Sequence, residues 1–384
     1  MNKKVLALAV AGALSAPAAA LAQVTVGGSV NILFYSHDPD NDSGTLAAGA
    51  GTSGDRMESS ESEINIRAGE KLGGGLDVWV QCASSADGIV GGTTQAARVL
   101  CTRNSALGFR GSFGNVFFGN WDTPMKLVQN AARGWFSGTN ALYGGSMIIL
   151  AGDSQSGAAN TGTSFYRRQA NSANYQSPNW GGFTIAAAFS ASNESTTGQN
   201  GTSIPDSSGL TPRLMGVNGM FRTGGLLVGL AYEKHDDYGN TSTGVSGTDD
   251  AYSLLVGYRI AGVNARALYQ QNKYENGPGL GEVQTGGFGV YVDWNIQGPH
   301  TLHFGYAKSD DVEDDSAGGK QQNTSADWMN IAYSYDLSKR TQLLFAYNQL
   351  KNDSNVAFSL EVQSSTTTLG GKGKSIGFAV RHRF

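Results

Sequence analysis

Charged side chains recur at alternate positions of extended, partly apolar stretches, and these are the residues whose types and spacing could do chemistry. From Glu61 to Arg67, acidic, polar and basic residues alternate with Ile64 and Ile66. A strand places successive side chains on opposite faces, so the charges share one face and the isoleucines the other. A soluble core does not accept three charges on a buried face. The charged face is therefore predicted to be wet and the isoleucine face to contact something apolar.

The chemistry that such a face could support is ion selection rather than bond making. Fixed charges of mixed sign around a narrow space with low-dielectric walls focus the electrostatic potential and bias which ions enter. Arg381 and Arg383 share the inward parity but could equally lie at a rim. The residues expected to line the lumen or its constriction are Arg67, Arg103, Arg168, Glu61, Glu63, Asp122, Arg266 and Asp293.

Motifs for catalysis or for metal binding are weak. The five histidines are scattered, with neither an H-E-x-x-H pair nor a nucleophile elbow. The stretch from Asp38 to Asp42 begins like a calcium loop but lacks the sixth-position glycine and has Gly49 where a glutamate is needed. We therefore predict no enzyme activity, no cofactor and no metal site. Acidic loop tips at 38–42 and 310–315 are interpreted as solvated, with divalent bridging to lipopolysaccharide as the alternative.

The elements that must position these charges are strands. Apolar and polar residues alternate along about sixteen runs, nearly all of which carry Tyr or Trp at an end. Short glycine-rich connections such as Gly69 to Gly75 alternate with long ones. Even strand number, aromatic girdles and this loop asymmetry are typical of outer-membrane barrels. The final run, Ser375 to Phe384, has an apolar face that would meet lipid and arginines that would face water. The fold class predicted is an all-β, antiparallel, up-and-down transmembrane β-barrel.

The N-terminus predicts export. Lys3 and Lys4 precede an apolar run and an Ala20-Leu21-Ala22 site, which together indicate a signal peptide at 1–22 and a single barrel domain at 23–384. No later window reaches the roughly 20 apolar residues that a spanning helix needs. The net charge of −4 argues against a nucleic-acid partner.

The two cysteines, Cys82 and Cys101, are expected to form a disulfide, which is the default in an exported chain. The bond would close the loop from Ala83 to Leu100. The chain-entropy model assigns roughly 3 kcal/mol to a loop of that size.

The longest connection, residues 122–166, is predicted to fold into the barrel. Long loops are usually functional or disordered. This one contains Trp135, Phe136, Tyr143 and the run from Met147 to Leu150, which is too apolar for a disordered external tail. We therefore expect it to pack against the wall and to narrow the lumen.

The chain also resembles the trimeric, sixteen-stranded general-diffusion porins of Gram-negative outer membranes, over essentially the whole mature sequence. The most specific stretches are Tyr335 to Thr341 (YDLSKRT), Arg381 to Phe384 (RHRF), Glu70 to Leu76 (EKLGGGL), Gly108 to Val116 (GFRGSFGNV), and Asn171 to Pro178 (NSANYQSP) preceded by Arg168.

The resemblance implies a passive homotrimeric pore with an inward third loop and a ring of arginines opposing acidic groups on that loop. It also implies that Phe384 is read by the barrel-assembly machinery. Arg67, Arg103 and Arg168 match basic positions, whereas Glu63 and Asn120 occupy positions where relatives carry arginine. The predicted ion selectivity is accordingly weak, with cations favoured over anions if either is favoured.

Two alternatives to general diffusion of ions and small hydrophilic solutes stay open. A channel specific for sugars or organic acids would line its constriction with aromatic residues, for which Trp79, Trp121, Trp135 and Tyr291 are candidates. A structural or adhesive barrel plugged by its long loop would conduct nothing. Saturable, solute-blocked conductance would favour the specific channel.

Overall fold

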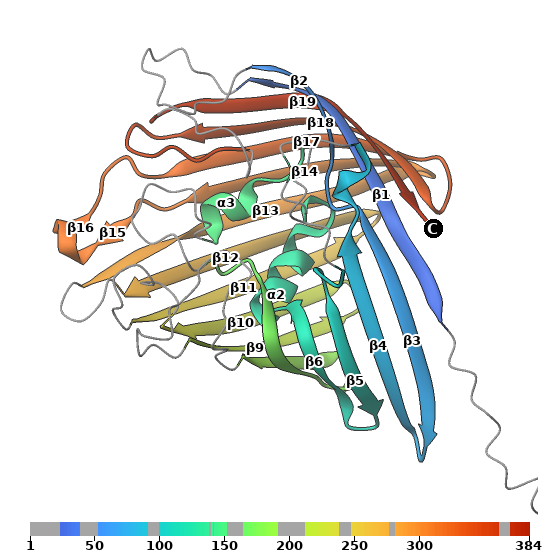
Figure 1. Cartoon of the computed structure of the whole chain (residues 1–384). Helices are drawn as coiled ribbons and strands as arrows, with labels where there is room; N and C mark the ends of the chain where they lie inside the picture. Colours follow the sequence, from blue (N-terminus) through green and yellow to red (C-terminus); the bar gives the residue numbers. More distant parts are fainter. Residues whose placement is uncertain are drawn as a thin grey trace, which may run out of the picture.

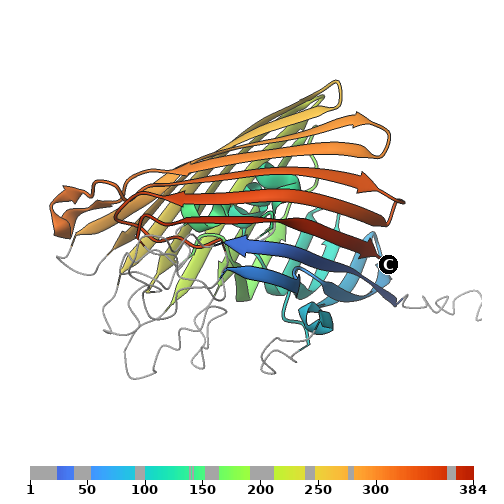
Figure 2. The same cartoon turned by 90° about the horizontal axis from the view of Figure 1, so that it is seen from above.

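The wall of the protein is one antiparallel sheet that closes on itself. The computed structural model describes residues 24–38, 53–90, 100–137, 140, 142–151, 164–190, 212–237, 247–275, 281–360 and 369–384. Within these ranges each long strand pairs with its sequence neighbours, and β1 (Thr25–Asp38) pairs with β19 (Lys372–Arg383). Figure 2 shows the blue first strand beside the dark red last one. The predicted closed β-barrel is confirmed.

Sixteen long strands build the wall in the described part of the chain. Besides β1 and β19 they are β3 (Glu63–Gly73), β4 (Leu76–Ser85), β5 (Ser105–Gly111), β6 (Gly114–Asp122), β7 (Arg168–Gln176), β8 (Phe183–Ser190), β9 (Arg213–Thr223), β10 (Leu226–Asp236), β11 (Thr248–Ile260), β12 (Val263–Glu275), β13 (Glu282–Gln297), β14 (His300–Ser309), β17 (Ala326–Asp336) and β18 (Thr341–Asn352). The short strands β2 (Gly54–Ser59), β15 (Glu313–Asp314) and β16 (Gly319–Lys320) extend the sheet beyond the long strands. Two 3-10 turns, η1 (Asp87–Val90) and η5 (Asp315–Ala317), lie in the connections.

Alternate residues of the wall face outward and are apolar. Phe118, Leu230 and Phe345 expose between 52% and 59% of their surface. Their neighbours point into the barrel and are small, polar or buried. An apolar surface that continues around a whole barrel is unfavourable in water. This face therefore suits contact with the hydrocarbon core of a membrane. Among the described residues, no helix has the length and apolarity needed to cross a bilayer.

The turn between β3 and β4 is tighter than the sequence suggested. The strand continues through Glu70 and Lys71 to Gly73, and only Gly74 and Gly75 lie between the two strands. Gly73, Gly74 and Gly75 all have positive φ (90°, 59° and 79°), which glycine adopts without steric cost. Lys71 therefore belongs to the wall.

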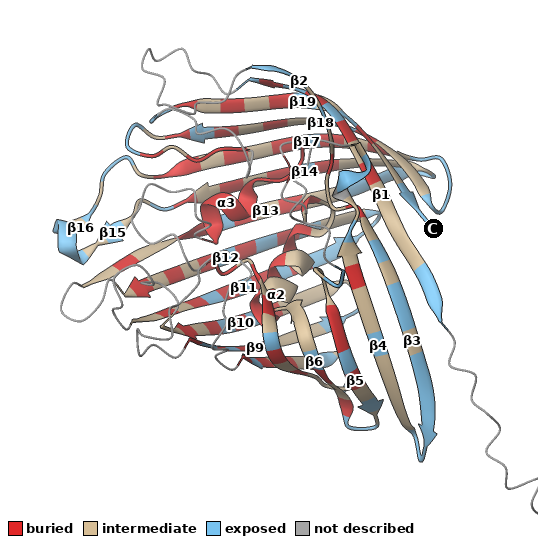
Figure 3. Ribbon diagram, viewed as in Figure 1, coloured by how far each residue is buried: buried red, intermediate tan, exposed pale blue. Residues whose placement is uncertain are grey.

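The described residues of the 122–166 loop, namely 122–137, 140, 142–151 and 164–166, lie inside the barrel. The loop begins with α2 (Pro124–Arg133), continues through η3 (Gly134–Phe136) and includes α3 (Ser146–Leu150). Thr123 caps α2 by accepting a hydrogen bond from the Lys126 amide at 3.3 Å, and Pro124 occupies the first turn, both of which favour helix initiation there. Figure 1 places both helices within the ring of strands, and Figure 3 shows them largely buried.

The core of the molecule consists of this loop and the wall that it covers. Met125, Val128 and Ala132 form one face of α2, and every residue of α3 is buried. They pack with inward side chains of β10 to β14, β17 and β18. The lumen is thus filled on this side, and the space that remains lies along the opposite strands, β3 to β7.

Candidate functional site

A cluster of opposite charges lines the free side of the lumen where the 122–166 loop leaves the wall. Asp122 ends β6 and is the cross-strand partner of Arg168, the first residue of β7. One Asp122 carboxylate oxygen lies 3.3 Å from Arg168 Nε and 2.9 Å from Lys126 Nζ. Lys126 is on the first turn of α2, so this carboxylate ties the loop to the wall.

Asn104 bridges the same charges. Its Oδ1 accepts a hydrogen bond from Arg168 Nε at 2.6 Å, and its Nδ2 donates to the other carboxylate oxygen of Asp122 at 2.9 Å. The side chain therefore fixes both partners of the ion pair with one amide group, which suits an amide's paired donor and acceptor. The sequence prediction included neither Asn104 nor Lys126.

A second ion pair lies next to the first. Arg103 Nε is 3.1 Å from a carboxylate oxygen of Glu63 on β3. The Arg103 amide donates to the Ala83 carbonyl at 2.8 Å, and its carbonyl accepts from Asn120 Nδ2 at 3.1 Å. Asn120 occupies a β-bulge between Gly119 and Trp121. The bulge turns its amide toward the segment that carries Arg103.

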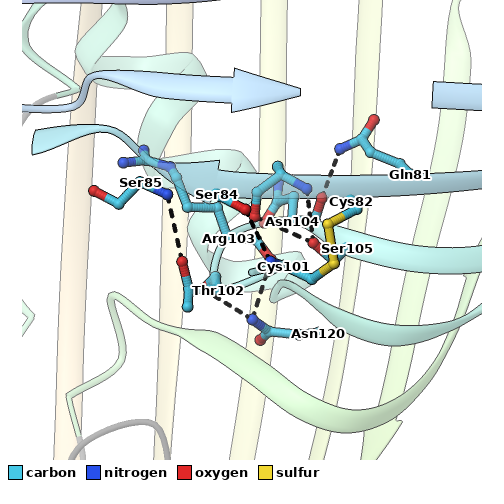
Figure 4. Close-up of a disulfide and its surroundings, with 11 residues drawn as sticks. Gln81, Cys82, Ser84, Ser85, Cys101, Thr102, Arg103, Asn104, Ser105 and Asn120 are labelled. Carbon is cyan, nitrogen blue, oxygen red and sulfur yellow. Dashed lines mark hydrogen bonds between the residues drawn. A yellow bond between two sulfur atoms is a disulfide. The ribbon is translucent and has the colours of Figure 1, made fainter. Parts of the chain in front are cut away.

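A disulfide between Cys82 and Cys101 holds that segment against β4. Figure 4 shows the bond beside Arg103, with Cys101 donating its amide to Ser84 Oγ at 2.9 Å. The cross-link joins residues 19 apart in the sequence. Its position two residues before Arg103 restrains where that guanidinium can lie.

Arg67 faces the same hollow without an ion-pair partner among the described residues. The hollow is lined by five of the predicted residues, Glu63, Arg67, Arg103, Asp122 and Arg168, together with Asn104 and Trp121. The exposed Arg67 side chain adds a positive charge that Glu63 and Asp122, which are each paired elsewhere, do not neutralise.

Glu61 lies outside the strand that was predicted for it. The chain bends between β2 and β3, where Glu61 has a φ of 61° and Ser62 is fully buried. The negative charge of the Glu61 carboxylate interacts electrostatically with Tyr143 of the inward loop. Burial, and then the charge of Glu61, raise the pKa of Tyr143 to about 12. Tyr143 is therefore neutral, and it accepts a hydrogen bond from Asn31 Nδ2 at 2.6 Å.

Arg266 and Asp293 lie on the opposite wall, away from the hollow. They pair with one another beneath the inward loop, where Gly134 crosses directly over the Arg266 guanidinium. Asp293 also contacts His303 Nδ1 at 2.7 Å. Because only 6% of Arg266 is exposed, this pair supports the loop and does not face open lumen. Arg381 supports the loop too, with its guanidinium 5.1 Å from the Trp135 ring centre.

Amide and indole donors from the wall hold the backbone of the inward loop. Trp328 Nε1 and Asn348 Nδ2 both donate to the Gly144 carbonyl, at 2.8 and 2.9 Å. Asn330, Asn272 and Asn218 make the same kind of bond at 2.7 to 3.0 Å, accepted by the carbonyls of Leu142, Leu150 and Pro124 respectively. Inward asparagines on strands were the signal in the sequence, since a buried amide needs a partner.

Comparison with known proteins gives a consistent assignment. Residues 7–355 match the family described as Gram-negative porin. The chain is 30% identical over 399 aligned residues to outer membrane porin protein 32 of Delftia acidovorans, with full coverage of both.

Solved structures share the fold. An anion-selective porin from Comamonas acidovorans superposes with a TM-score of 0.75 at 21% identity, covering 94% of this chain and 100% of that one. OmpT of Vibrio cholerae, in its trimer form, superposes with a TM-score of 0.65 at 12% identity, covering 94% and 99%.

Proposed function

The chain belongs to the Gram-negative porin family, and on this premise we propose how its barrel conducts. It is an outer-membrane protein whose water-filled channel passes ions and small hydrophilic solutes by passive diffusion. The constriction lies between the 122–166 loop and strands β3 to β7, at the hollow formed by Glu63, Arg67, Arg103, Asp122 and Arg168. No catalytic step and no cofactor enters this mechanism.

The single observation that carries this proposal is the position of the inward loop. Its apolar face is packed against β10 to β14, β17 and β18, and the Asp122, Lys126 and Arg168 cluster joins its first turn to β6 and β7. Solutes must therefore pass the charged hollow, because the other half of the lumen is occupied by protein. Fixed charges around a constriction of this kind set the ion preference.

We further propose a weak preference for anions. Three cations, Arg67, Arg103 and Arg168, line the hollow together with the carboxylates Glu63 and Asp122. A fourth cation, Lys126, is paired with Asp122 at its edge. The sequence alone suggested the opposite sign because Glu63 and Asn120 stand where relatives carry arginine. It also counted Glu61, which is absent from the lining of the hollow, and overlooked Lys126. Arg266 and Asp293 were counted with opposite signs, so their removal does not change the balance. In the structure Asp293 is paired with Arg266 under the loop.

Reversal potentials of the refolded protein in planar bilayers test this proposal. In a tenfold KCl gradient we expect an anion-selective potential that is a fraction of the roughly 59 mV of an ideally selective pore. Arg168→Glu should shift it toward cation selectivity and Glu63→Arg in the opposite direction. Arg222→Glu, at the exposed end of β9, is the matched control and should change it little. A folded barrel that does not conduct would contradict the channel, and a cation-selective wild type would contradict the charge assignment.

The surroundings of the pore complete the proposal. Residues 1–22, which lie outside the described residues, are proposed to be a signal peptide, and the outward apolar face is proposed to contact lipid and lipopolysaccharide. We propose a homotrimer, supported by the trimeric OmpT neighbour. Phe384 is proposed to be the residue that the barrel-assembly machinery reads.

A further inference from the structure

An aromatic patch lies on the lumen face of β4 and β6, on the short-turn side of the charged hollow. The ring centre of Trp79 is 5.5 Å from that of Phe117 and 5.9 Å from that of Trp121, and Phe117 and Trp121 are 4.9 Å apart. Of the four aromatic residues that were candidates for a solute track, only Trp79 and Trp121 meet. Trp135 packs against Tyr143, and Tyr291 is fully buried.

The backbone around the patch is shaped to receive the Trp79 ring. Gly108 is its cross-strand neighbour, and a Cβ added there would lie 2.6 Å from both the Trp79 ring and the Phe117 Cβ. Trp79 Nε1 donates to Asn115 Oδ1 at 2.8 Å. Phe117 is 1% exposed and forms the base, while Trp79 and Trp121 stay partly exposed. The patch is thus a fixed apolar shelf in an otherwise polar lumen.

Guanidinium groups flank this shelf on both sides along the pore. The strand register places Arg67 beside Gln81 on the row above Trp79, toward the hollow. Arg110 lies beside Asp77 on the row below, toward the short turns. Both arginines are exposed, and neither has an ion-pair partner among the residues that the structure describes. In the lower row, Asp77 lies between Arg110 and Lys71. One carboxylate therefore stands against two cations there, and the two rows that flank the shelf carry a net positive charge.

A second hollow, which adjoins the charged hollow, is lined by Trp79, Trp121 and both arginines. Gln81 and Asn115 also line this second hollow. It shares Arg67, Gln81 and Trp121 with the charged hollow above. A solute that leaves the constriction on this side of the lumen therefore meets the shelf next.

We propose that this shelf is a binding site for small aromatic carboxylates. The solute ring would lie against Trp79 and Trp121, and its carboxylate would be bound by the Arg67 guanidinium, which presents paired donors to a carboxylate. Arginines on the flanks favour an anion over a neutral sugar, and an apolar shelf favours a ring over a small aliphatic acid. The inference rests on the proposed channel and names the solute class that it would retain.

Single-channel recording with benzoate tests the proposal. We expect benzoate to interrupt the KCl current in a saturable manner at concentrations where acetate and benzyl alcohol do not. Trp79→Ala should raise the half-blocking concentration roughly three- to tenfold, the value of one aromatic contact. Arg67→Gln should raise it by a similar factor. Because Arg67 is exposed, this variant carries the test even if the Trp79 variant fails to fold.

Matched substitutions separate the site from general effects. Trp294→Ala, on the outer face with 47% of its surface exposed, and Arg222→Gln should leave the half-blocking concentration unchanged. A pore that conducts KCl but is blocked no better by benzoate than by acetate would overturn the binding site and leave the channel intact. Block that survives both Trp79→Ala and Arg67→Gln would overturn it as well. Absence of any KCl current from the folded barrel would overturn the channel and the site together.

Discussion

At the scale of single residues, the two ion pairs of the hollow differ in whether the carboxylate has a second cationic partner. Arg168 shares Asp122 with Lys126, so removing Arg168 leaves that carboxylate paired. Arg103 is the partner of Glu63, and the Glu63 side chain is 32% exposed, against 12% for Asp122. Parity in the sequence identified Arg168, and the family resemblance identified Arg103, but neither showed which acid each arginine would meet.

This difference in pairing predicts that neutralising Arg103 and neutralising Arg168 change the reversal potential by different amounts. Arg103→Gln should shift the reversal potential toward cation selectivity more strongly than Arg168→Gln, because it uncovers a carboxylate that faces the lumen. Both shifts are measured in the same KCl gradient, with Arg222→Gln as the control. Equal shifts, or a larger one for Arg168→Gln, would contradict the pairing described for these residues.

At the scale of elements, the 122–166 loop is positioned by polar anchors as well as by its apolar face. Gly144 receives hydrogen bonds from both Trp328 and Asn348. Gly145, with a φ of 125°, lies so close to the Trp328 indole that an added Cβ would be 2.6 Å from its nitrogen. Composition showed that this loop is too apolar to be external, but the wall residues that hold it are 184 and 204 positions away in the chain.

Because Trp328 and Asn348 donate to the same Gly144 carbonyl, we expect the effects of their substitutions on the conductance to be non-additive. Trp328→Phe or Asn348→Leu alone leaves the Gly144 carbonyl with one donor and should alter the conductance little. The double variant leaves a buried carbonyl unsatisfied, which costs about 1–3 kcal/mol, and should give a larger, fluctuating single-channel conductance. The interaction is read from a double-mutant cycle.

Asn295→Leu is the matched control for the anchors. Its Nδ2 also donates to a carbonyl, that of Gly298, but at an exposed turn, so its loss should not change the pore. Strictly additive behaviour of the Trp328 and Asn348 variants would show that the loop does not depend on these bonds.

At the scale of the whole molecule, the barrel closes where its first and last strands meet. Phe34 stacks on Phe378 with ring centres 4.9 Å apart. At the chain end, Gly28 and Phe384 exchange two backbone hydrogen bonds of 3.1 Å. A side chain on Gly28 would collide with the Glu63 carbonyl, which explains a glycine at this position. The seam therefore uses Phe384 through its backbone, whereas 49% of the residue's surface is exposed.

This arrangement separates a folding role of Phe384 from a targeting role. Phe384→Ala keeps both backbone bonds, so refolding in detergent should be close to wild type while the amount assembled in the outer membrane falls severalfold. Phe378→Ala, within β19 and on the outer face, should do the reverse and lower stability by about 0.5–1.5 kcal/mol through loss of its ring contact. Unchanged assembly of Phe384→Ala would rule out the targeting role.

The sequence by itself determined the outer wall of this protein. Period-two alternation is local, and it assigns each side chain to the lipid or the lumen face without knowledge of distant contacts. It therefore predicted the strands and the closed barrel, whereas the inward loop was predicted from its apolar composition. Parity does not give the height of a residue in the lumen, and it fails where the chain departs from regular pairing, as at the bend of Glu61 and the bulge at Asn120.

Only the tertiary structure decided which charges meet. Asp122 and Arg168 are brought together by the strand register across an entire folded loop, and Arg266 and Asp293 are removed from the lumen because that loop covers them. Trp79 and Trp121 form one shelf because β5 carries a glycine between their strands. These outcomes depend on register, sheet curvature and loop path, which arise from contacts between residues far apart in the chain.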